Sequence, residues 1–242
     1  MKLRNCAILA TLAWASPQAH AEARRIVIDP GHGGSNLGAK GAAAGVMEKD
    51  VTLALSQEVA TALRGAGLEV VLTRTGDQTL TLRQRSAAAN AARADLFISV
   101  HANAAPKRNQ RGFETYVLTP GSVEVIAPAL RSDEPTVRPG VTAAVANVLD
   151  DVERGATQWE AAELAVELQT ALRATRGGEF DRGVRQDAQH VLLGATMPAV
   201  LVEVGFVDHP VEGRELIEPR TRTEIAKALA QAILREARAL SR

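Results

Sequence analysis

Residues 25–34 read Arg-Ile-Val-Ile-Asp-Pro-Gly-His-Gly-Gly. The β-branched run, which ends at Asp29, predicts a buried strand, because Val and Ile pack well on a pleated surface. The Pro30-Gly31 pair predicts a turn directly after the strand. His32 therefore follows the point where a strand ends, at the edge of the sheet to which that strand belongs.

The next seventy residues alternate between helical and strand patterns. From Glu48, apolar residues recur at every fourth position up to Leu63, which is typical of a helix with one buried face. Residues 68–73 and 96–100 have strand patterns, and residues 81–93 between them form an Ala-rich helical segment. This order of strands and helices predicts a parallel sheet with right-handed crossovers.

The second half of the chain continues in the same style. Strand patterns occur at residues 112–118, 190–193 and 199–204, and helical patterns at residues 141–153, 156–175 and 212–239. No internal repeat is present, and no linker separates two cores. We therefore expect one α/β catalytic domain over residues 22–242.

Residues 1–21 are predicted to be a secretory signal peptide. Lys2 and Arg4 precede a short apolar run, and Ala19-His20-Ala21 fits a cleavage site. The run is too short for a transmembrane helix, and no later stretch reaches the roughly 18 apolar residues that a membrane span needs. The one cysteine, Cys6, lies in this segment, so the mature protein would have no disulfide and no thiol nucleophile. We expect an exported protein, periplasmic or extracellular.

The charge balance argues against an electrostatic nucleic-acid binder. Lys and Arg together number 28, as do Asp and Glu, so the formal net charge is zero. Proteins that bind nucleic acid through its phosphates carry an excess of basic residues. We expect no nucleic-acid partner, and we expect a monomer.

Two histidines and two glutamates are predicted to meet at one edge of the sheet. His32 follows the first strand, His101 follows the third, Glu48 begins the first helix, and Glu203 lies at the end of the apolar strand 199–204. Ligands of an open α/β sheet bind at the carboxyl ends of its strands. A catalytic zinc takes three N or O ligands and leaves one position for water. His32, Glu48 and His101 can supply those ligands, and Glu203 can act as general base and acid.

Each of these residues also has an ordinary explanation when taken alone. A histidine at a strand end is often a hydrogen-bonded surface group, and a glutamate at the first turn of a helix is favoured by the helix dipole. Glu203 differs, because a carboxylate inside the run Val-Leu-Val-Glu-Val-Gly-Phe is costly unless it is paired or functional. Only the convergence of all four residues favours a metal site.

Four motifs, in order along the chain, resemble those of the zinc-dependent N-acetylmuramoyl-L-alanine amidases, the bacterial cell-wall amidases of the amidase-3 type. They are Ile26-Val27-Ile28-Asp29-Pro30-Gly31-His32-Gly33-Gly34, Glu48-Lys49-Asp50, Ser99-Val100-His101-Ala102-Asn103 and Pro198-Ala199-Val200-Leu201-Val202-Glu203-Val204-Gly205-Phe206. The likeness runs from about residue 24 to the C-terminus. Each motif is weak by itself, but the ensemble is specific.

The resemblance implies a six-stranded, mostly parallel, twisted sheet flanked by helices on both faces. It implies that His32, Glu48 and His101 hold Zn²⁺ and that Glu203 is catalytic. The implied reaction is hydrolysis of the amide between the lactyl group of N-acetylmuramic acid and L-alanine of the peptidoglycan stem peptide, in wall remodelling, cell separation or lysis. One departure concerns the loop after His32, where Ser35-Asn36-Leu37 stands in place of the family's frequent Asp and Pro.

Residues 119–151 are predicted to be a regulatory insertion. The segment 119–140 is rich in Pro, Ser and charge, and residues 141–153 have helical periodicity. Regulated members of the family carry here a helix that covers the site until an activator protein lifts it. The resemblance therefore implies latency and an activator partner, while an ordinary surface helix fits the pattern equally well.

Other functions remain open at the level of sequence. A zinc peptidase or another amide hydrolase would use the same ligands, and a non-catalytic peptidoglycan-binding protein would be marked by loss of one of the four residues, all of which are present. A serine or cysteine hydrolase is disfavoured, because the chain has no Gly-x-Ser-x-Gly elbow. His190 and His209 are expected to be ordinary hydrogen-bonded histidines, although His190 could line the substrate crevice.

Overall fold

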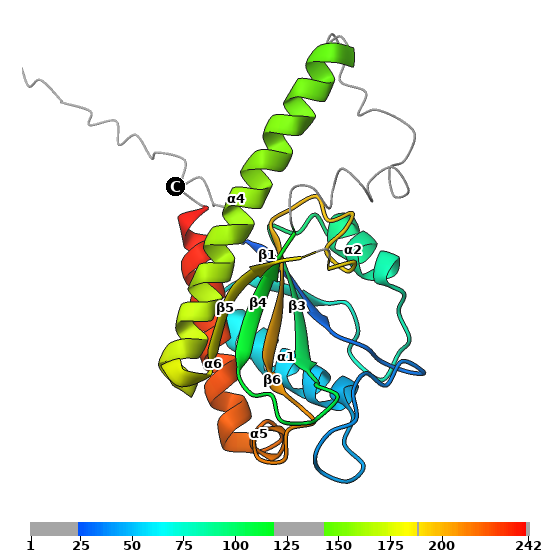
Figure 1. The fold of residues 1–242 in the computed structure, drawn as a ribbon. Coiled ribbons are helices and arrows are strands. Elements are labelled where there is room, and N and C mark those ends of the chain that lie inside the picture. The colour runs from blue at the N-terminus through cyan, green and yellow to red at the C-terminus, as the bar shows by residue number, and fades with distance from the viewer. Residues whose placement is uncertain (1–23, 119–142, 188, 241–242) are drawn as a thin grey trace, which may run out of the picture.

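The computed structural model describes residues 24–118, 143–187 and 189–240, and of residues 143–155 it describes the backbone alone. Within this part of the chain the structure is a single α/β domain built around one six-stranded sheet (Figure 1). The strands are β1 (Arg25–Pro30), β2 (Glu69–Leu72), β3 (Leu96–Asn103), β4 (Phe113–Val117), β5 (Asp181–Gln186) and β6 (Ala199–Phe206).

In the described part of the chain the helices lie between the strands and after the last one. They are α1 (Glu48–Gly65), α2 (Leu82–Ala91), α4 (Ala143–Arg176), the short α5 (Glu212–Glu215) and α6 (Pro219–Ala239), with one 3-10 turn at Gly178–Phe180. Within the described residues no helix is both long and apolar enough to cross a membrane.

The sheet is mostly parallel, as predicted. Its strand order is β2-β1-β3-β6-β4-β5; the pairs among β2, β1, β3 and β6 are parallel, β4 and β5 are parallel to each other, and only the β4–β6 pair is antiparallel. Because of this one reversal, β4 and β5 begin at the same edge of the sheet at which β1, β3 and β6 end. This edge is the one where the sequence places His32 and His101.

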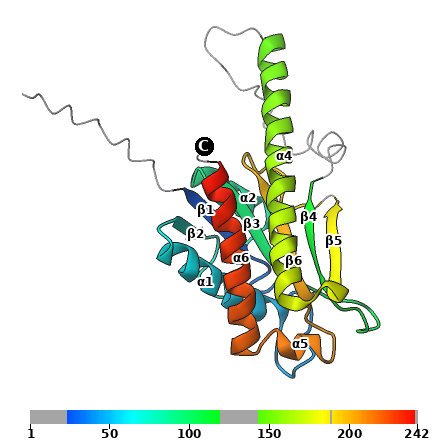
Figure 2. The ribbon, with the colours of Figure 1, turned by 90° about the vertical axis from the view of Figure 1, so that its left-hand side faces the viewer.

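Helices cover both faces of the sheet, but unequally. On one face α1, α4 and α6 pack against alternate residues such as Ile26, Ile28 and Val200, which are fully buried. Figure 2 shows α4 and α6 side by side over this face. On the other face Val27 and Phe97 pack under α2 and under the turn at residues 189–194. This second layer is thinner than the first, since it consists of one helix and one turn.

Two strands end later than the sequence predicts, and both differences affect the site. The third strand continues to Asn103 instead of ending at Val100, so His101 lies within β3, next to a register shift between His101 and Asn103. The sixth strand likewise continues to Phe206, which places Glu203 inside β6. Both residues are therefore held by strand backbone rather than by a loop.

The predicted strand at residues 190–193 is wrong. These residues form turns, with Leu192 N donating to Gln189 O and Leu193 N donating to His190 O. Val191, Leu192 and Leu193 are buried against the second face of the sheet, and a short apolar run of this kind looks the same in a strand and in a buried turn. The strand that completes the sheet is β5, a polar segment that carries no apolar alternation.

The predicted division of the long helical region is also wrong. Residues 143–176 form one helix, α4, which continues through Arg154 and Gly155. A glycine inside a helix costs only about 1 kcal/mol relative to alanine, so it need not end one. Residues 119–142, most of the predicted regulatory insertion, lie outside the described residues, and residues 143–151 are the first turns of α4, which extends beyond the sheet (Figures 1 and 2).

A buried ion pair ties the end of β1 to α2. Asp29 and Arg85 are 0% and 3% exposed in their side chains, with 2.7 Å between Asp29 Oδ1 and Arg85 Nη1. Ser99 Oγ donates to Asp29 Oδ2 at 2.8 Å, and Thr73 Oγ1 donates to Oδ1. Arg85 also donates to Pro30 O at 2.8 Å and to His32 O at 2.6 Å. The same pair thus fixes the backbone that carries His32.

Replacing Asp29 by alanine should strongly destabilise the protein, because it leaves the Arg85 guanidinium buried without its counter-charge. The expected loss in the free energy of unfolding is about 3–5 kcal/mol, measured by urea denaturation. Arg220, whose ion pair with Glu224 lies on the surface, is the control, and Arg220→Ala should leave stability unchanged within error. A loss for Asp29→Ala no larger than that of the control would contradict this account.

Candidate metal and catalytic site

Three side chains converge at the predicted edge of the sheet. Glu48 Oε1 lies 3.0 Å from His32 Nε2 and 3.0 Å from His101 Nδ1. The two imidazole rings meet edge to face, with 4.9 Å between their centroids. One potential ligand atom from each residue lies within 4.8 Å of the others, and this is the one cluster of three or more such residues in the described part of the chain. Two imidazoles and one carboxylate could hold a divalent metal ion.

Glu48 is held by the backbone on both of its oxygens. Ala39 N donates to Oε2 at 2.9 Å, and Ala102 N donates to Oε1 at 3.2 Å. Glu48 is the first residue of α1, and its own backbone N donates to Ala39 O at 2.8 Å. Gly38, at φ +65°, leaves room for this arrangement, since a Cβ there would lie 2.6 Å from Glu48 Oε2. The orientation of the carboxylate is thus set before any ligand binds.

His32 is held in a conformation that few side chains adopt. Its φ is 60°, in the left-handed region, and Arg85 stabilises its carbonyl. Its Nδ1 lies 2.9 Å from Asn36 Oδ1. Because the amide oxygen can only accept, this contact places a proton on Nδ1 and leaves Nε2 as the nitrogen that faces Glu48. In the metal-free protein Nε2 donates to Glu48, and after loss of its proton it can serve as a metal ligand. Asn36 belongs to the loop in which the sequence departs from the family pattern, and its role was not predicted.

Arg74 stabilises the loop after β1 through hydrogen bonds to its backbone carbonyls. Its guanidinium, in a residue only 2% exposed, donates to Pro30 O at 3.0 Å and to Gly31 O at 2.8 Å. Gly31 itself lies against the His101 ring, and a Cβ there would come within 2.4 Å of His101 Cε1. The Pro-Gly-His sequence is therefore needed for packing: the glycine lets the loop after β1 pass directly under the second imidazole.

Glu48 and His32 shift each other's pKa values. Burial alone would raise the pKa of Glu48, but hydrogen bonds from His101 and His32 outweigh burial and hold that pKa far below its usual range. Burial alone would lower the pKa of His32, but the hydrogen bond and the charge of Glu48 outweigh it, so the pKa of His32 is raised. In the metal-free protein the cluster is an ion pair with Glu48 ionised.

Glu203 faces the same region from β6. Its Cα pairs with that of His101 across the sheet. Among the described residues its Oε2 atom is buried without a hydrogen-bond partner. Burial raises the pKa of Glu203 well above its usual value, and the charges of Glu48 and Glu114 raise it further. A buried carboxyl oxygen without a partner is rare in folded proteins and is typical of a group with a chemical task.

Strand alternation explains why these side chains share one face. On β3, Val100 and Ala102 belong to the core under α1, α4 and α6, so His101 points to the opposite face. On β6 the same alternation between Val202 and Val204 turns Glu203 that way. The site therefore lies on the thinly covered face, at the edge where that cover ends.

A second carboxylate on this face was not predicted from the sequence. Glu114, on β4, is 2% exposed and its Cα pairs with that of Glu203. Asn103 Nδ2 donates to its Oε1 at 2.7 Å, and Tyr116 OH donates to the same atom at 3.0 Å. Tyr116 has its pKa raised to about 12, by burial first and then by the bond to Glu114. The signal for Glu114 was the alternation Phe-Glu-Thr-Tyr-Val in β4, which puts a charged residue on a buried face.

The two remaining described histidines lie outside the cluster. His209 Nδ1 accepts from Glu212 N at 3.1 Å and from Val211 N at 3.3 Å, so it caps the turn that begins α5. This is the hydrogen-bonded role that we expected of it. His190 lies in the turn at residues 189–194, and its side chain is exposed.

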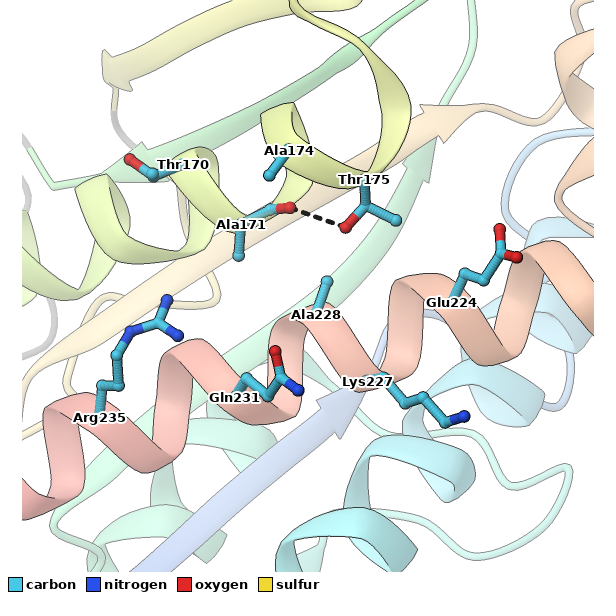
Figure 3. Close-up of a pocket in the computed structure, with 9 residues that line it drawn as sticks. All are labelled: Thr170, Ala171, Ala174, Thr175, Glu224, Lys227, Ala228, Gln231 and Arg235. Carbon is cyan, nitrogen blue, oxygen red and sulfur yellow. Dashed lines mark hydrogen bonds between the residues drawn. The ribbon is translucent and has the colours of Figure 1, made fainter.

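A groove between α4 and α6 can be set aside as the reaction site. It is lined by small and surface residues, among them Thr170, Ala174 and Ala228, and Figure 3 shows that they come from those two helices. The groove lies on the face covered by α1, α4 and α6. It contains none of the histidines and no clustered carboxylates.

Comparison with known proteins agrees with the geometry. The sequence model of a family described as N-acetylmuramoyl-L-alanine amidase, Amidase_3, matches residues 26–235. The uncharacterised protein YqiI of Bacillus subtilis is 30% identical over 96% of this chain and 94% of its own length. The N-acetylmuramoyl-L-alanine amidase AmiA of Escherichia coli is 32% identical over 87% of this chain and 75% of its own length.

A solved structure shows the same fold. The N-acetylmuramoyl-L-alanine amidase AmiC2 of Nostoc punctiforme is 27% identical and superposes with a TM-score of 0.67, covering 90% of this chain and 98% of that one. The prediction of a six-stranded α/β domain is thereby confirmed.

The stability of the metal-free protein should depend on pH through the Glu48–His32 pair. The lowered pKa of Glu48 stabilises the fold above pH 4.5, and this contribution is lost as the pH falls through the folded-state pKa. The raised pKa of His32 stabilises the fold below pH 6.5, and this contribution is lost as the pH rises through the folded-state pKa. Both contributions are complete only between these two values.

In the presence of EDTA, the wild type should therefore exceed Glu48→Gln in the free energy of unfolding by the largest margin between pH 4.5 and pH 6.5. Urea denaturation of both proteins over a pH series measures this margin. Glu224→Gln, on the surface of α6, is the control and should show no such maximum. A margin for Glu48→Gln that does not change with pH would count against the ion pair.

Proposed function

Since the chain belongs to the amidase-3 family of N-acetylmuramoyl-L-alanine amidases, we propose that it is a zinc-dependent enzyme that hydrolyses the amide between the lactyl group of N-acetylmuramic acid and L-alanine in peptidoglycan. One observation carries the proposal: the unpartnered Glu203 oxygen lies on the same face and at the same edge of the sheet as the His32–Glu48–His101 cluster. The reaction contributes to wall remodelling, separation of daughter cells or lysis.

The donor set supports zinc. His32 Nε2, Glu48 Oε1 and His101 Nδ1 are three N and O donors close enough together to share one ion, and zinc in hydrolases takes this set while keeping a position open. When bound, zinc polarises the carbonyl oxygen of the substrate and lowers the pKa of water near it. Asn36 orients the His32 ring, and two backbone N–H groups orient the Glu48 carboxylate, so the ligand atoms are held in place.

Glu203 moves the protons of the reaction. Its carboxylate takes a proton from the attacking water, whose oxygen bonds to the lactyl carbonyl carbon. As the carbon–nitrogen bond breaks, Glu203 returns that proton to the alanine nitrogen, which leaves as a free amine. Burial raises the pKa of Glu203, which makes its carboxylate a stronger proton acceptor than an ordinary glutamate. The products are the muramyl carboxylic acid and a stem peptide with a free amino terminus.

Export and partners form part of the proposal. We infer that residues 1–21 are removed as a signal peptide and that the mature enzyme, a monomer, acts on peptidoglycan in the periplasm or outside the cell. The support is the sequence pattern of that segment and the cell-wall substrate of the family.

Replacing Glu203 by glutamine should slow turnover strongly without loss of the metal. Proton transfer by a positioned side chain contributes about 10²–10⁴-fold, so kcat should fall by that factor. Residues 22–242 would be loaded with zinc and incubated with purified peptidoglycan, newly freed L-alanine amino termini would be counted, and bound zinc would be measured by atomic absorption. Glu224→Gln is the matched control and should keep full activity.

The products separate this proposal from its alternatives. A zinc peptidase would free amino termini other than that of L-alanine, and a non-catalytic wall-binding protein would bind peptidoglycan and free none. Glu203→Gln turnover equal to the wild type would remove Glu203 from the mechanism while leaving the amidase proposal intact.

The regulatory insertion at residues 119–151 stays a prediction. If it restrains the enzyme until an activator binds, deletion of residues 123–139 should raise the basal rate of L-alanine release, because the restraint can no longer reach the site. Wild-type and deleted proteins would be compared on the same peptidoglycan without any added partner. Equal rates would contradict the prediction of latency.

A further inference from the structure

Next to Glu203, two arginines converge on one buried carboxylate. Arg182 Nε and Arg185 Nε, both from β5, lie 3.0 Å and 2.6 Å from Glu114 Oε2. The other oxygen of Glu114 is occupied by Asn103 and Tyr116. Two guanidinium charges therefore meet a single carboxylate, and the cluster has an excess of one positive charge.

This excess charge is accessible to a ligand. The Arg185 side chain is 46% exposed and that of Arg182 is 29% exposed, whereas Glu114 below them is 3% exposed in its side chain. Arg182 also donates through Nη1 to Gln110 Oε1 at 3.1 Å. Among the described residues the one ion pair of the Arg185 guanidinium is the contact of its Nε with Glu114, and almost half of its side chain is exposed to solvent. One arginine would be enough to neutralise Glu114.

The arginine pair lies beside the reacting centre. β5 begins at the same edge of the sheet as β4, where β3 and β6 end. Glu114, which anchors the pair, is in register with Glu203. The Arg182 guanidinium lies over the ring of Phe206, the last residue of β6, at 5.0 Å from its centroid. Adjacent strands are about 4.8 Å apart, so β5 lies roughly 10 Å from β6, within reach of a bound peptide.

The geometry points to a carboxylate-binding subsite: we propose that Arg185 and Arg182 bind the free α-carboxylate of the second stem-peptide residue, on the leaving side of the scissile amide. This inference rests on the proposed amidase function. The second residue is a glutamate joined onward through its side chain, so its α-carboxyl is either free or amidated. It follows the scissile amide by one residue, which spans about 3.5 Å. The long arginine side chains of β5 would cover the rest of the distance between the strands.

Guanidinium chemistry would make this subsite selective. A guanidinium donates two parallel hydrogen bonds to a carboxylate, with charge assistance on both sides. The amidated form of the same residue, isoglutamine, carries no charge and presents an NH₂ group toward the arginines. The enzyme should therefore prefer wall material whose second stem residue has a free carboxylate.

The test compares two substrates that differ only in this group. Peptidoglycan fragments with glutamate or with isoglutamine at the second stem position would be digested by the wild-type protein, by Arg185→Gln and by Arg185→Lys. We expect the wild type to show a kcat/KM about tenfold or more higher on the acid, in line with a charged hydrogen bond. Arg185→Gln should lose most of this preference through a higher KM on the acid, with little change on the amide.

Two further variants control for structural damage. Arg173, on α4, is 66% exposed and lies 3.6 Å from Asp181 rather than on Glu114, so Arg173→Gln should keep the full preference. Arg185→Lys keeps the positive charge but loses the two parallel N–H donors of the guanidinium. It should therefore keep part of the preference for the acid that Arg185→Gln loses.

The outcomes are distinguishable. If the wild type cuts both substrates equally, or if Arg185→Gln slows both by the same factor, the carboxylate subsite is wrong and the amidase function stands. If the wild type frees L-alanine from neither fragment nor from whole peptidoglycan, the proposed function itself fails and the subsite fails with it.

Discussion

The fold of the site depends on the buried pair formed by Asp29 and Arg85. A guanidinium enclosed in this way needs a partner for each donor, and it finds the Asp29 carboxylate together with the carbonyls of Pro30 and His32. Those carbonyls belong to a turn that would otherwise leave its polar groups unsatisfied. By satisfying them, one side chain from α2 determines where the chain goes after β1, and hence where His32 meets Glu48.

The site itself is an arrangement of three acidic groups with different partners. Glu48 is ionised, because two imidazoles and two backbone N–H groups donate to it. Glu114 is surrounded by two guanidiniums, an amide and a phenol. Glu203, between them, has a buried oxygen with no partner. The pKa of Glu48 is lowered by its hydrogen-bond donors and that of Glu203 is raised by burial, so these two carboxylates differ in proton affinity.

Much of this architecture could be predicted from the sequence, and the failures have specific causes. The apolar periodicities around Val27, Leu55 and Phe97 predicted the parallel half of the sheet, because these residues are buried on both faces of the core. The sequence does not predict β5, because an edge strand needs no apolar alternation. It predicts a strand at residues 190–193, because a short buried apolar run has the same pattern in a turn as in a strand. His32, Glu48 and His101 could be identified because their motifs are contiguous, whereas Glu114 and Arg185 are brought together by strand pairing over a gap that includes all of α4. Nothing local to either residue indicates that they meet.

The polar character of β5 has a consequence for solubility. It is the last strand of the sheet, and its outer side has no neighbour among the described strands. An open strand edge is a template on which another chain can add a strand, and proteins block such growth with charges and irregular pairing. β5 has both, since it carries Arg182 and Arg185 and its pairing with β4 shifts register. The two guanidiniums that contact Glu114 therefore also place positive charge on the outermost strand, where charge disfavours the addition of a strand from a second molecule.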